Sequence, residues 1–275
     1  MTEWSQATGA DGQTFVFREA GSGPVVLLFH GFPDTPHGWE EIAQAVAATG
    51  RRVVWPWLRG YHPATLVPGR GYDAVTLGRD AIALLDALGV DKATIVGHDW
   101  GALVTYGAAS LHPERVEAIV PVAIPHPSLL PRTPQSLWAA RHFFSLRMPW
   151  AERMVARNGF SYINMIYHRW APSWRGADRD ACIANVKECF REPSSLTGAL
   201  DYYRAIKPRP DPQVARPPAV RALIVGGTAD LAPAELFTKT AEVMDGRALI
   251  LDGTGHWPHR ERQDEFIAGL LDFLG

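Results

Sequence analysis

The fold is decided by residues 93–101, Ala-Thr-Ile-Val-Gly-His-Asp-Trp-Gly. An apolar run of the kind that forms a strand leads into a Gly-Xaa-Asp-Xaa-Gly pentapeptide, and small residues with helical character continue to Leu111. Glycines on both sides of Asp99 permit a tight turn that lifts the central side chain above a sheet. The pattern predicts a strand, a sharp turn and a helix, with a carboxylate at the turn.

Short apolar runs alternate with helical patterns on both sides of this stretch. Strands are expected at residues 24–29, 52–56, 116–123, 220–225 and 248–251, and helices at 39–49 and 77–88. The run at 24–29 is apolar at every position, which is typical of a strand covered on both faces. Strands that alternate with helices predict an α/β fold with a mostly parallel central sheet flanked by helices.

Residues 128–212 have a different character. They contain helical patterns without a clear strand, several tyrosines and tryptophans 138, 150, 170 and 174, and they end in a proline-rich stretch typical of a stiff return linker. We therefore expect an α/β core of residues 1–127 and 213–275 with an inserted helical domain at 128–212.

Composition excludes several classes of partner. Apolar residues make up 47% of the chain and charged residues 20%, and the net charge is −2 without a run of like charges. Neither a nucleic-acid groove nor a polybasic membrane surface is expected, and a small neutral molecule fits best. Cys182 and Cys189 are expected to be two packed thiols and not a disulfide. The N-terminus lacks a signal pattern, and no apolar run is long enough to span a bilayer. A cytoplasmic protein is therefore expected.

Asp99 is a candidate nucleophile. A serine alkylated at a saturated carbon would become an unreactive ether, whereas an alkylated carboxylate is an ester that water can cleave. An aspartate at this turn therefore predicts displacement at an sp³ carbon, and the helix N-terminus beneath it would keep it ionised. The simpler alternative is that Asp99 only caps the helix.

Two further residues complete a nucleophile, acid and base set in that chain order. Asp230 follows the strand at 220–225, and His256 follows the apolar run at 248–251. Loops after parallel strands are where such sheets carry their sites. His256 would activate water and Asp230 would hold its imidazole in the right tautomer. The alternatives are a turn aspartate and a packed loop histidine.

The segment His30-Gly31-Phe32-Pro33 supplies the remaining piece. Backbone N–H groups of Phe32 and Trp100 could together hold the oxyanion formed when the ester is attacked. His30 and Pro33 would shape the loop, although the same residues also read as a strand-ending turn. We expect no metal site at His256 and His259, because no acidic or cysteine ligand accompanies them at a useful spacing, and no cofactor.

With these segments assembled, the chain resembles the α/β-hydrolase superfamily, and within it the branch of epoxide hydrolases and haloalkane dehalogenases. The resemblance covers nearly the whole chain. It rests on the segment 30–33 with Trp39 downstream, the pentapeptide 97–101, Asp230 and His256. It implies that the insert is a cap that closes over the nucleophile, and that the enzyme opens epoxides to vicinal diols.

The resemblance also implies two hydrogen-bond donors in the cap that face the epoxide oxygen. Tyr203 matches one of them, with a packed tyrosine as the alternative. The second falls in residues 138–144, where the chain departs from the family tyrosine and His142 is the candidate. Trp57 is a further departure, because relatives often have aspartate there. The substrate is expected to lie against His30, Pro33, Trp100, Trp138 and Trp257, and the tryptophan-rich cap could pair two copies as a homodimer.

Two classes of alternative function remain open, dehalogenation and ligand binding without catalysis. Haloalkane dehalogenation uses the same Asp99 and His256 but needs two N–H donors for the halide, of which Trp100 could be one. Fluoroacetate dehalogenases carry arginines after the nucleophile, where this chain has Trp100 and Leu103, so that alternative ranks lower. A small-molecule receptor without catalysis would have no need of the full set of three residues.

Overall fold

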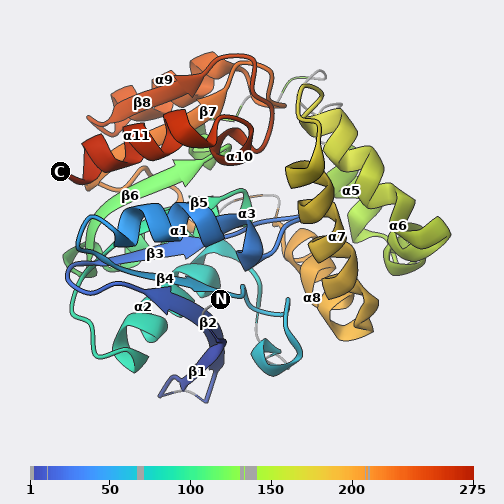
Figure 1. Ribbon diagram of the computed structural model, residues 1–275, viewed down its shortest axis with the longest axis horizontal. Coiled ribbons are helices and arrows are strands. Elements are labelled where there is room, and N and C mark those ends of the chain that lie inside the picture. Colours follow the sequence, from blue (N-terminus) through green and yellow to red (C-terminus); the bar gives the residue numbers. More distant parts are fainter. Residues whose placement is uncertain are drawn as a thin grey trace.

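The computed structural model describes residues 3–10, 12–66, 71–130, 133, 141–207, 209 and 211–275. Its strands form one eight-stranded sheet in the order β1-β2-β4-β3-β5-β6-β7-β8 (Figure 1). The strands are β1 Ser5–Thr8, β2 Thr14–Ala20, β3 Val25–Phe29, β4 Arg52–Pro56, β5 Ala93–His98, β6 Val116–Val122, β7 Arg221–Gly227 and β8 Arg247–Leu251. The strands from β4 to β8 in this order run parallel, so the predicted mostly parallel sheet is confirmed.

The sequence analysis missed the two strands at the N-terminal edge. β1 pairs antiparallel with β2, and β2 pairs antiparallel with β4. β1 is the four-residue segment Ser-Gln-Ala-Thr and is mostly exposed, so it has neither an apolar run nor an alternating pattern. Its place depends on backbone pairing with β2, which a search for apolar periodicity does not detect.

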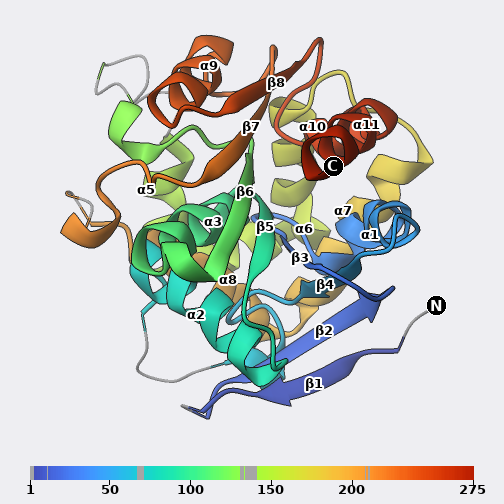
Figure 2. The same cartoon turned by 90° about the vertical axis from the view of Figure 1, so that its left-hand side faces the viewer.

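Helices cover both faces of the sheet (Figure 2). The core helices are α1 Glu40–Ala47, α2 Ala74–Ala87, α3 Trp100–Leu111, α9 Ala234–Val243, α10 Pro258–Glu261 and α11 Gln263–Leu274. Val26 and Leu28 pack on the side of α1 and α11, while Leu27 and Phe29 pack on the side of α2 and α3. Because successive strand residues point to opposite faces, a fully apolar strand supplies both layers of the core.

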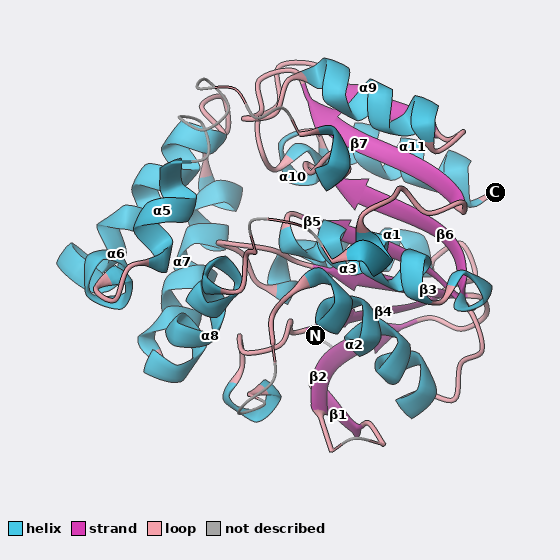
Figure 3. Ribbon diagram, turned by 180° about the vertical axis from the view of Figure 1, so that it is seen from behind, coloured by secondary structure: helices cyan, strands magenta, loops and turns pink. Residues whose placement is uncertain are grey.

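The chain between β6 and β7 contains a group of helices at the carboxyl end of the parallel strands (Figure 3). They are α5 Arg141–Arg147, α6 Ala151–Trp170, α7 Ala177–Arg191 and α8 Pro193–Arg204. Tyr202 Oη donates a hydrogen bond to the Arg59 carbonyl at 2.9 Å. A Cβ at Gly198 in α8 would lie 2.2 Å from the Gly60 carbonyl oxygen, so glycine allows α8 to approach the core loop. Helix α8 therefore lies directly on the loop that follows β4.

Two smaller predictions concern thiols and membranes. Cys182 and Cys189 are free thiols on α7, as the sequence suggested. No helix among the described residues combines the length and apolar character needed to cross a membrane.

Candidate active site

Asp99 lies at the turn between β5 and α3 with φ 52° and ψ −112°. A Cβ at Gly97 would lie 2.0 Å from the Gly101 carbonyl oxygen, and one at Gly101 would lie 2.2 Å from the Phe29 carbonyl oxygen. Both contacts are with backbone, so neither position accepts a larger residue without moving the strand. Although Asp99 stands at the N-cap position, its side chain makes no capping hydrogen bond. The turn instead directs the carboxylate toward the loops after β3 and β8.

The three residues expected to act together are in contact. His256 Nε2 lies 3.3 Å from Asp99 Oδ2, and His256 Nδ1 lies 2.9 Å from Asp230 Oδ1. Asp230 Oδ1 also accepts the backbone N–H of Leu231 at 2.6 Å, which fixes the carboxylate. The side chains of His256 and Asp230 are almost fully buried, while 12% of the Asp99 side chain is exposed. The nucleophile candidate is therefore the accessible end of this chain of contacts.

The charges of Asp99 and His256 each favour the ionised form of the other residue. Burial alone lowers the pKa of His256, but the charge and hydrogen bond of Asp230 and the contact with Asp99 outweigh it and raise that pKa to about 10. Burial alone raises the pKa of Asp99, but the hydrogen bond and charge of His256 bring it below its ordinary value. At neutral pH the resting site therefore holds an imidazolium beside an ionised Asp99 carboxylate.

Backbone donors lie on the other side of Asp99. The Phe32 N–H donates to Asp99 Oδ1 at 2.7 Å. Trp100 is the first residue of α3, so its backbone N–H has no acceptor within the helix. A Cβ at Gly31 would lie 2.4 Å from the Asp99 Cβ, so the loop after β3 can approach the turn only with glycine there. Two N–H groups are thus available near the carbonyl of an Asp99 ester.

Three residues expected to touch the substrate also make contacts within the protein. The His30 Nδ1–H donates to the Gly31 carbonyl at 3.1 Å, while Nε2 accepts the Leu58 N–H at 3.0 Å. The Pro33 carbonyl accepts a hydrogen bond from Tyr167 Oη at 2.8 Å. Trp257 is fully buried and donates its Nε1–H to Asp34 Oδ2 at 3.2 Å. These contacts fix the three residues in the walls of the site, and Trp138, the remaining tryptophan expected there, lies outside the described residues.

Tyr203 and His142 come from α8 and α5 and meet above the nucleophile loops. The Tyr203 ring lies edge-on to Phe32 and to Trp100, with both centroid distances 5.1 Å. The His142 ring centroid lies 6.2 Å from that of Tyr203. Burial raises the pKa of Tyr203 well above its usual value, and the Asp99 charge adds to this effect. Tyr203 Oη donates no hydrogen bond within the part of the chain that the structure describes, so its proton is available to a ligand.

Sequence reasoning missed two contributors to the site. The Trp170 carbonyl on α6 accepts the His256 backbone N–H at 2.8 Å, and its ring lies 5.2 Å from the His256 ring. His98 lies within the pentapeptide and contacts the His256 carbonyl through Nε2 at 2.7 Å. Trp170 was only one tryptophan among several in the insert, and no local pattern links residue 98 to residue 256.

The chain is similar to known proteins in sequence and in fold. A family model described as the alpha/beta hydrolase fold matches residues 24–166. The chain is 31% identical to Epoxide hydrolase A of Mycobacterium tuberculosis, over 91% of this chain and 90% of that protein.

Solved structures are similar over the whole chain. The crystal structure of Epoxide Hydrolase A from Mycobacterium thermoresistibile is 26% identical with a TM-score of 0.80, over 100% of this chain and 98% of that one. The epoxide hydrolase CorEH has a TM-score of 0.86 at 22% identity, over 100% of this chain and 99% of that one, which shows a shared fold. The chain therefore belongs to the α/β-hydrolase superfamily and lies close to its epoxide hydrolases.

Proposed function

We propose that this protein hydrolyses epoxides to vicinal diols, with Asp99 as the nucleophile and His256, oriented by Asp230, as the base. One observation carries the proposal: an aspartate at the turn has one carboxylate oxygen 3.3 Å from His256 Nε2 and the other bound to the Phe32 N–H. Because an aspartyl ester can be hydrolysed and a seryl ether cannot, this nucleophile suits a saturated electrophilic carbon. The curated relative named Epoxide hydrolase A supports the substrate class.

In the first step an Asp99 oxygen attacks a ring carbon, and the carbon–oxygen bond of the ring breaks. The lowered pKa of Asp99 keeps it ionised for this attack. The developing alkoxide takes the proton of Tyr203 Oη, which is present at neutral pH because the pKa of Tyr203 is raised. His142, whose ring lies beside Tyr203, is the second donor that we assign to the ring oxygen.

In the second step water cleaves the ester. Esterification removes the Asp99 charge, which is one of the causes of the high pKa of His256, so His256 can release its proton to restore the phenol of Tyr203. The neutral imidazole then takes a proton from water, and the hydroxide attacks the ester carbonyl. The Phe32 and Trp100 N–H groups hold the oxyanion until the ester C–O bond breaks. The leaving alkoxide then takes the proton of the new carboxyl group, which releases the diol and restores the Asp99 carboxylate.

The helices between β6 and β7 would serve as the cap of this site. We divide the chain into a core of residues 1–127 and 213–275 and a cap of residues 128–212. Support comes from Tyr167 Oη, which donates to the Pro33 carbonyl, and from the Trp170 carbonyl, which accepts the His256 N–H. A cap held on the loop after β3 and on the loop of the base excludes bulk water from the charged pair, which strengthens its electrostatic interactions. Its aromatic side chains, such as Trp170 and Phe143, favour a small apolar substrate.

Haloalkane dehalogenation is the second candidate. Trp100 Nε1 is buried and has no hydrogen-bond acceptor among the described residues, so it could donate to a halide. Phe32 stands where a second side-chain donor would be needed, and Tyr203 has no task in halide release. A receptor that does not catalyse would need none of the contacts between Asp99, His256 and Asp230.

Intact-protein mass spectrometry of a His256→Gln variant tests the proposal. The variant is incubated separately with a panel of epoxides and a panel of alkyl halides. Without the base, the ester on Asp99 should accumulate, and its mass increase should equal that of the whole epoxide. An added Asp99→Asn change is the control and should abolish the adduct.

Other outcomes of this experiment would favour a different function. A mass increase equal to the alkyl group without its halogen would move the assignment to dehalogenation. No adduct from either panel would contradict the nucleophile proposal. Binding of panel compounds that is unaffected by Asp99→Ala, without turnover by the wild type, would indicate a receptor.

A further inference from the structure

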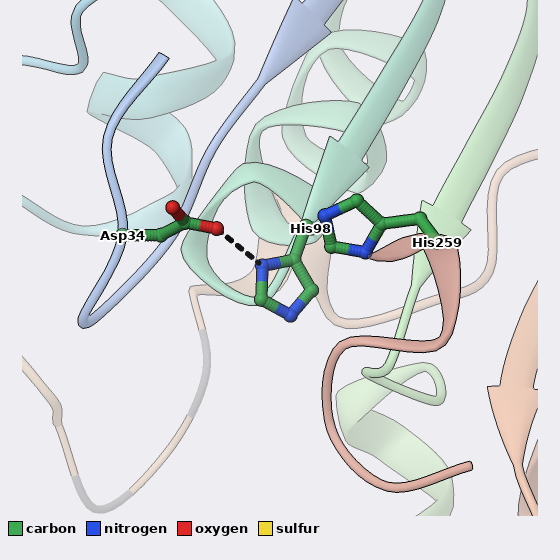
Figure 4. A group of neighbouring side chains, drawn as sticks. All are labelled: Asp34, His98 and His259. Atoms are coloured by element: carbon green, nitrogen blue, oxygen red, sulfur yellow. Dashed lines mark ion pairs between the residues drawn. The ribbon is translucent and has the colours of Figure 1, made fainter. Parts of the chain in front are cut away.

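A cluster of three buried side chains lies behind the Asp99–His256 pair. Asp34 comes from the loop after β3, His98 from the end of β5, and His259 from α10 (Figure 4). All three are buried, and one ligand atom from each lies within 4.8 Å of the other two. The cluster thus joins the loop that carries Phe32, the strand that precedes Asp99 and the segment that follows His256.

The hydrogen bonds of His98 determine what its second nitrogen can do. His98 Nε2 lies 2.7 Å from the His256 carbonyl, so Nε2 carries the proton and donates it. In the neutral ring Nδ1 then has a free lone pair, and it lies 3.8 Å from Asp34 Oδ2. When Asp34 is ionised, two acceptors therefore face each other across a gap without a hydrogen between them.

His259 is also left without partners. Neither of its ring nitrogens has a hydrogen-bond partner within the described residues, and the same holds for His98 Nδ1. The His259 ring lies between Trp39 and His98, with both centroid distances 4.6 Å. Buried polar atoms are normally satisfied, so three unpartnered nitrogens beside a carboxylate indicate that a ligand belongs between them.

The sequence offered His259 no acidic ligand nearby, but the fold brings Asp34 and His98 to it. We propose that Asp34, His98 and His259 bind a divalent transition-metal ion, with Zn²⁺ as the ion of choice. Two imidazole nitrogens and one carboxylate oxygen are ligands that Zn²⁺ prefers, and a tetrahedral ion has room for a fourth ligand. At metal–ligand distances of about 2.0–2.2 Å the ligand atoms would move together by roughly 1 Å.

The surroundings match those of a metal ligand set. Histidines that bind a metal usually donate their other N–H to a backbone carbonyl, as His98 does to His256. Asp34 is oriented in the same way, because Oδ1 accepts the Thr35 N–H and Oδ2 accepts the Trp257 Nε1–H. Such contacts hold His98 and Asp34 in place before the ion arrives, while His259 is positioned by its ring contacts with Trp39 and His98.

Arg260 is the nearby positive charge that could oppose a cation, since its charge acts on Asp34. Its guanidinium is paired with Asp178 of α7 and with Glu41 of α1. These two carboxylates offset its charge. The imidazolium of His256 adds a second positive charge, which is paired with Asp99 and Asp230.

The proposed ion is structural. It touches neither the substrate nor Asp99, and it joins three segments that are distant in the sequence. Because it would bind the folded chain and not the unfolded one, it should stabilise the fold and hold His256 in place through His98. It does not depend on the reaction proposed above.

Metal binding is measured directly, without an activity assay. The full chain is expressed with added Zn²⁺, dialysed, and its metal content determined. A second sample is refolded in the presence of Co²⁺ alone, because the buried ligands offer an ion little access in the folded state. We expect one Zn²⁺ per chain, and visible absorption bands of four-coordinate Co²⁺ that excess Zn²⁺ removes. The melting temperature should rise with bound Zn²⁺.

Asp34→Asn and His259→Ala should lower the affinity for Zn²⁺ by at least about 10–100-fold and abolish the Co²⁺ bands. Asp34→Asn keeps the shape of the side chain, so it serves if His259→Ala fails to fold. His168→Ala removes an exposed histidine on α6 and should leave the stoichiometry unchanged. A wild-type chain that holds no stoichiometric metal by either route would overturn the proposal and leave a bridging water as the occupant. Retention of the bands in both ligand variants would also overturn it.

Discussion

The adjacent residues Tyr202 and Tyr203 allow a test in which chemistry and stability separate. Both are buried on α8. Tyr202 Oη donates to the Arg59 carbonyl at 2.9 Å, whereas Tyr203 lies against Phe32 and Trp100 beside the nucleophile. Replacement of each tyrosine by phenylalanine removes one hydroxyl and little volume. The two variants are therefore matched controls for each other.

Tyr202→Phe should lower the free energy of unfolding by about 1–3 kcal/mol, because a buried carbonyl loses its donor. Its rate of ester formation on Asp99 should stay close to that of the parent. Tyr203→Phe should slow ester formation by roughly 10²–10⁴-fold, the usual contribution of a general acid. This factor equals about 3–5 kcal/mol in the activation barrier. Its stability should change less than that of Tyr202→Phe, because Tyr203 Oη donates no hydrogen bond to a described residue and loses only its interaction with the Trp100 side chain.

Both variants are made in the His256→Gln background, where the ester accumulates. Rapid-quench mass spectrometry gives the rate of ester formation, and denaturant unfolding gives the stability. The reasoning is refuted if Tyr203→Phe forms the ester at the parental rate. It is equally refuted if Tyr202→Phe slows ester formation as much as Tyr203→Phe does.

Three further predictions concern the nucleophile, the base and its partner. The pKa of His256 rises from 6.5 to about 10 on folding, so its contribution to stability is complete below pH 6.5 and is lost as the pH rises through about 10. The unfolding free energy of the wild type should therefore fall more steeply than that of His256→Gln over this range in urea titrations. Gly31→Ala should abolish ester formation, because its Cβ would lie 2.4 Å from the Asp99 Cβ. A Gly31→Ala variant that forms the ester in a burst at the wild-type rate would contradict this prediction. Asp230→Asn should slow hydrolysis of the ester by about 10⁴-fold, as loss of the orienting carboxylate does in related triads, so mass spectrometry during turnover should detect the adduct.

The sequence by itself determined the parts of this protein that depend on local pattern. Mostly apolar runs predicted β3 to β8, and β3, which is covered on both faces, is apolar at every position. The glycines around Asp99 predicted the sharp turn, because backbone contacts there exclude any side chain. The position of Asp230 and His256 after strands predicted a common edge of the sheet, and all three residues meet there.

Only the tertiary structure decided which side chains face the site. Tyr202 and Tyr203 are neighbours on one helix, and about 100° of rotation separates them; packing of α8 on the core turns Tyr202 to Arg59 and Tyr203 to Phe32. The cluster of Asp34, His98 and His259 is likewise invisible in the sequence, because its members come from three separate segments. Their meeting depends on the order of strands in the sheet, which is fixed by long-range packing and not by local pattern.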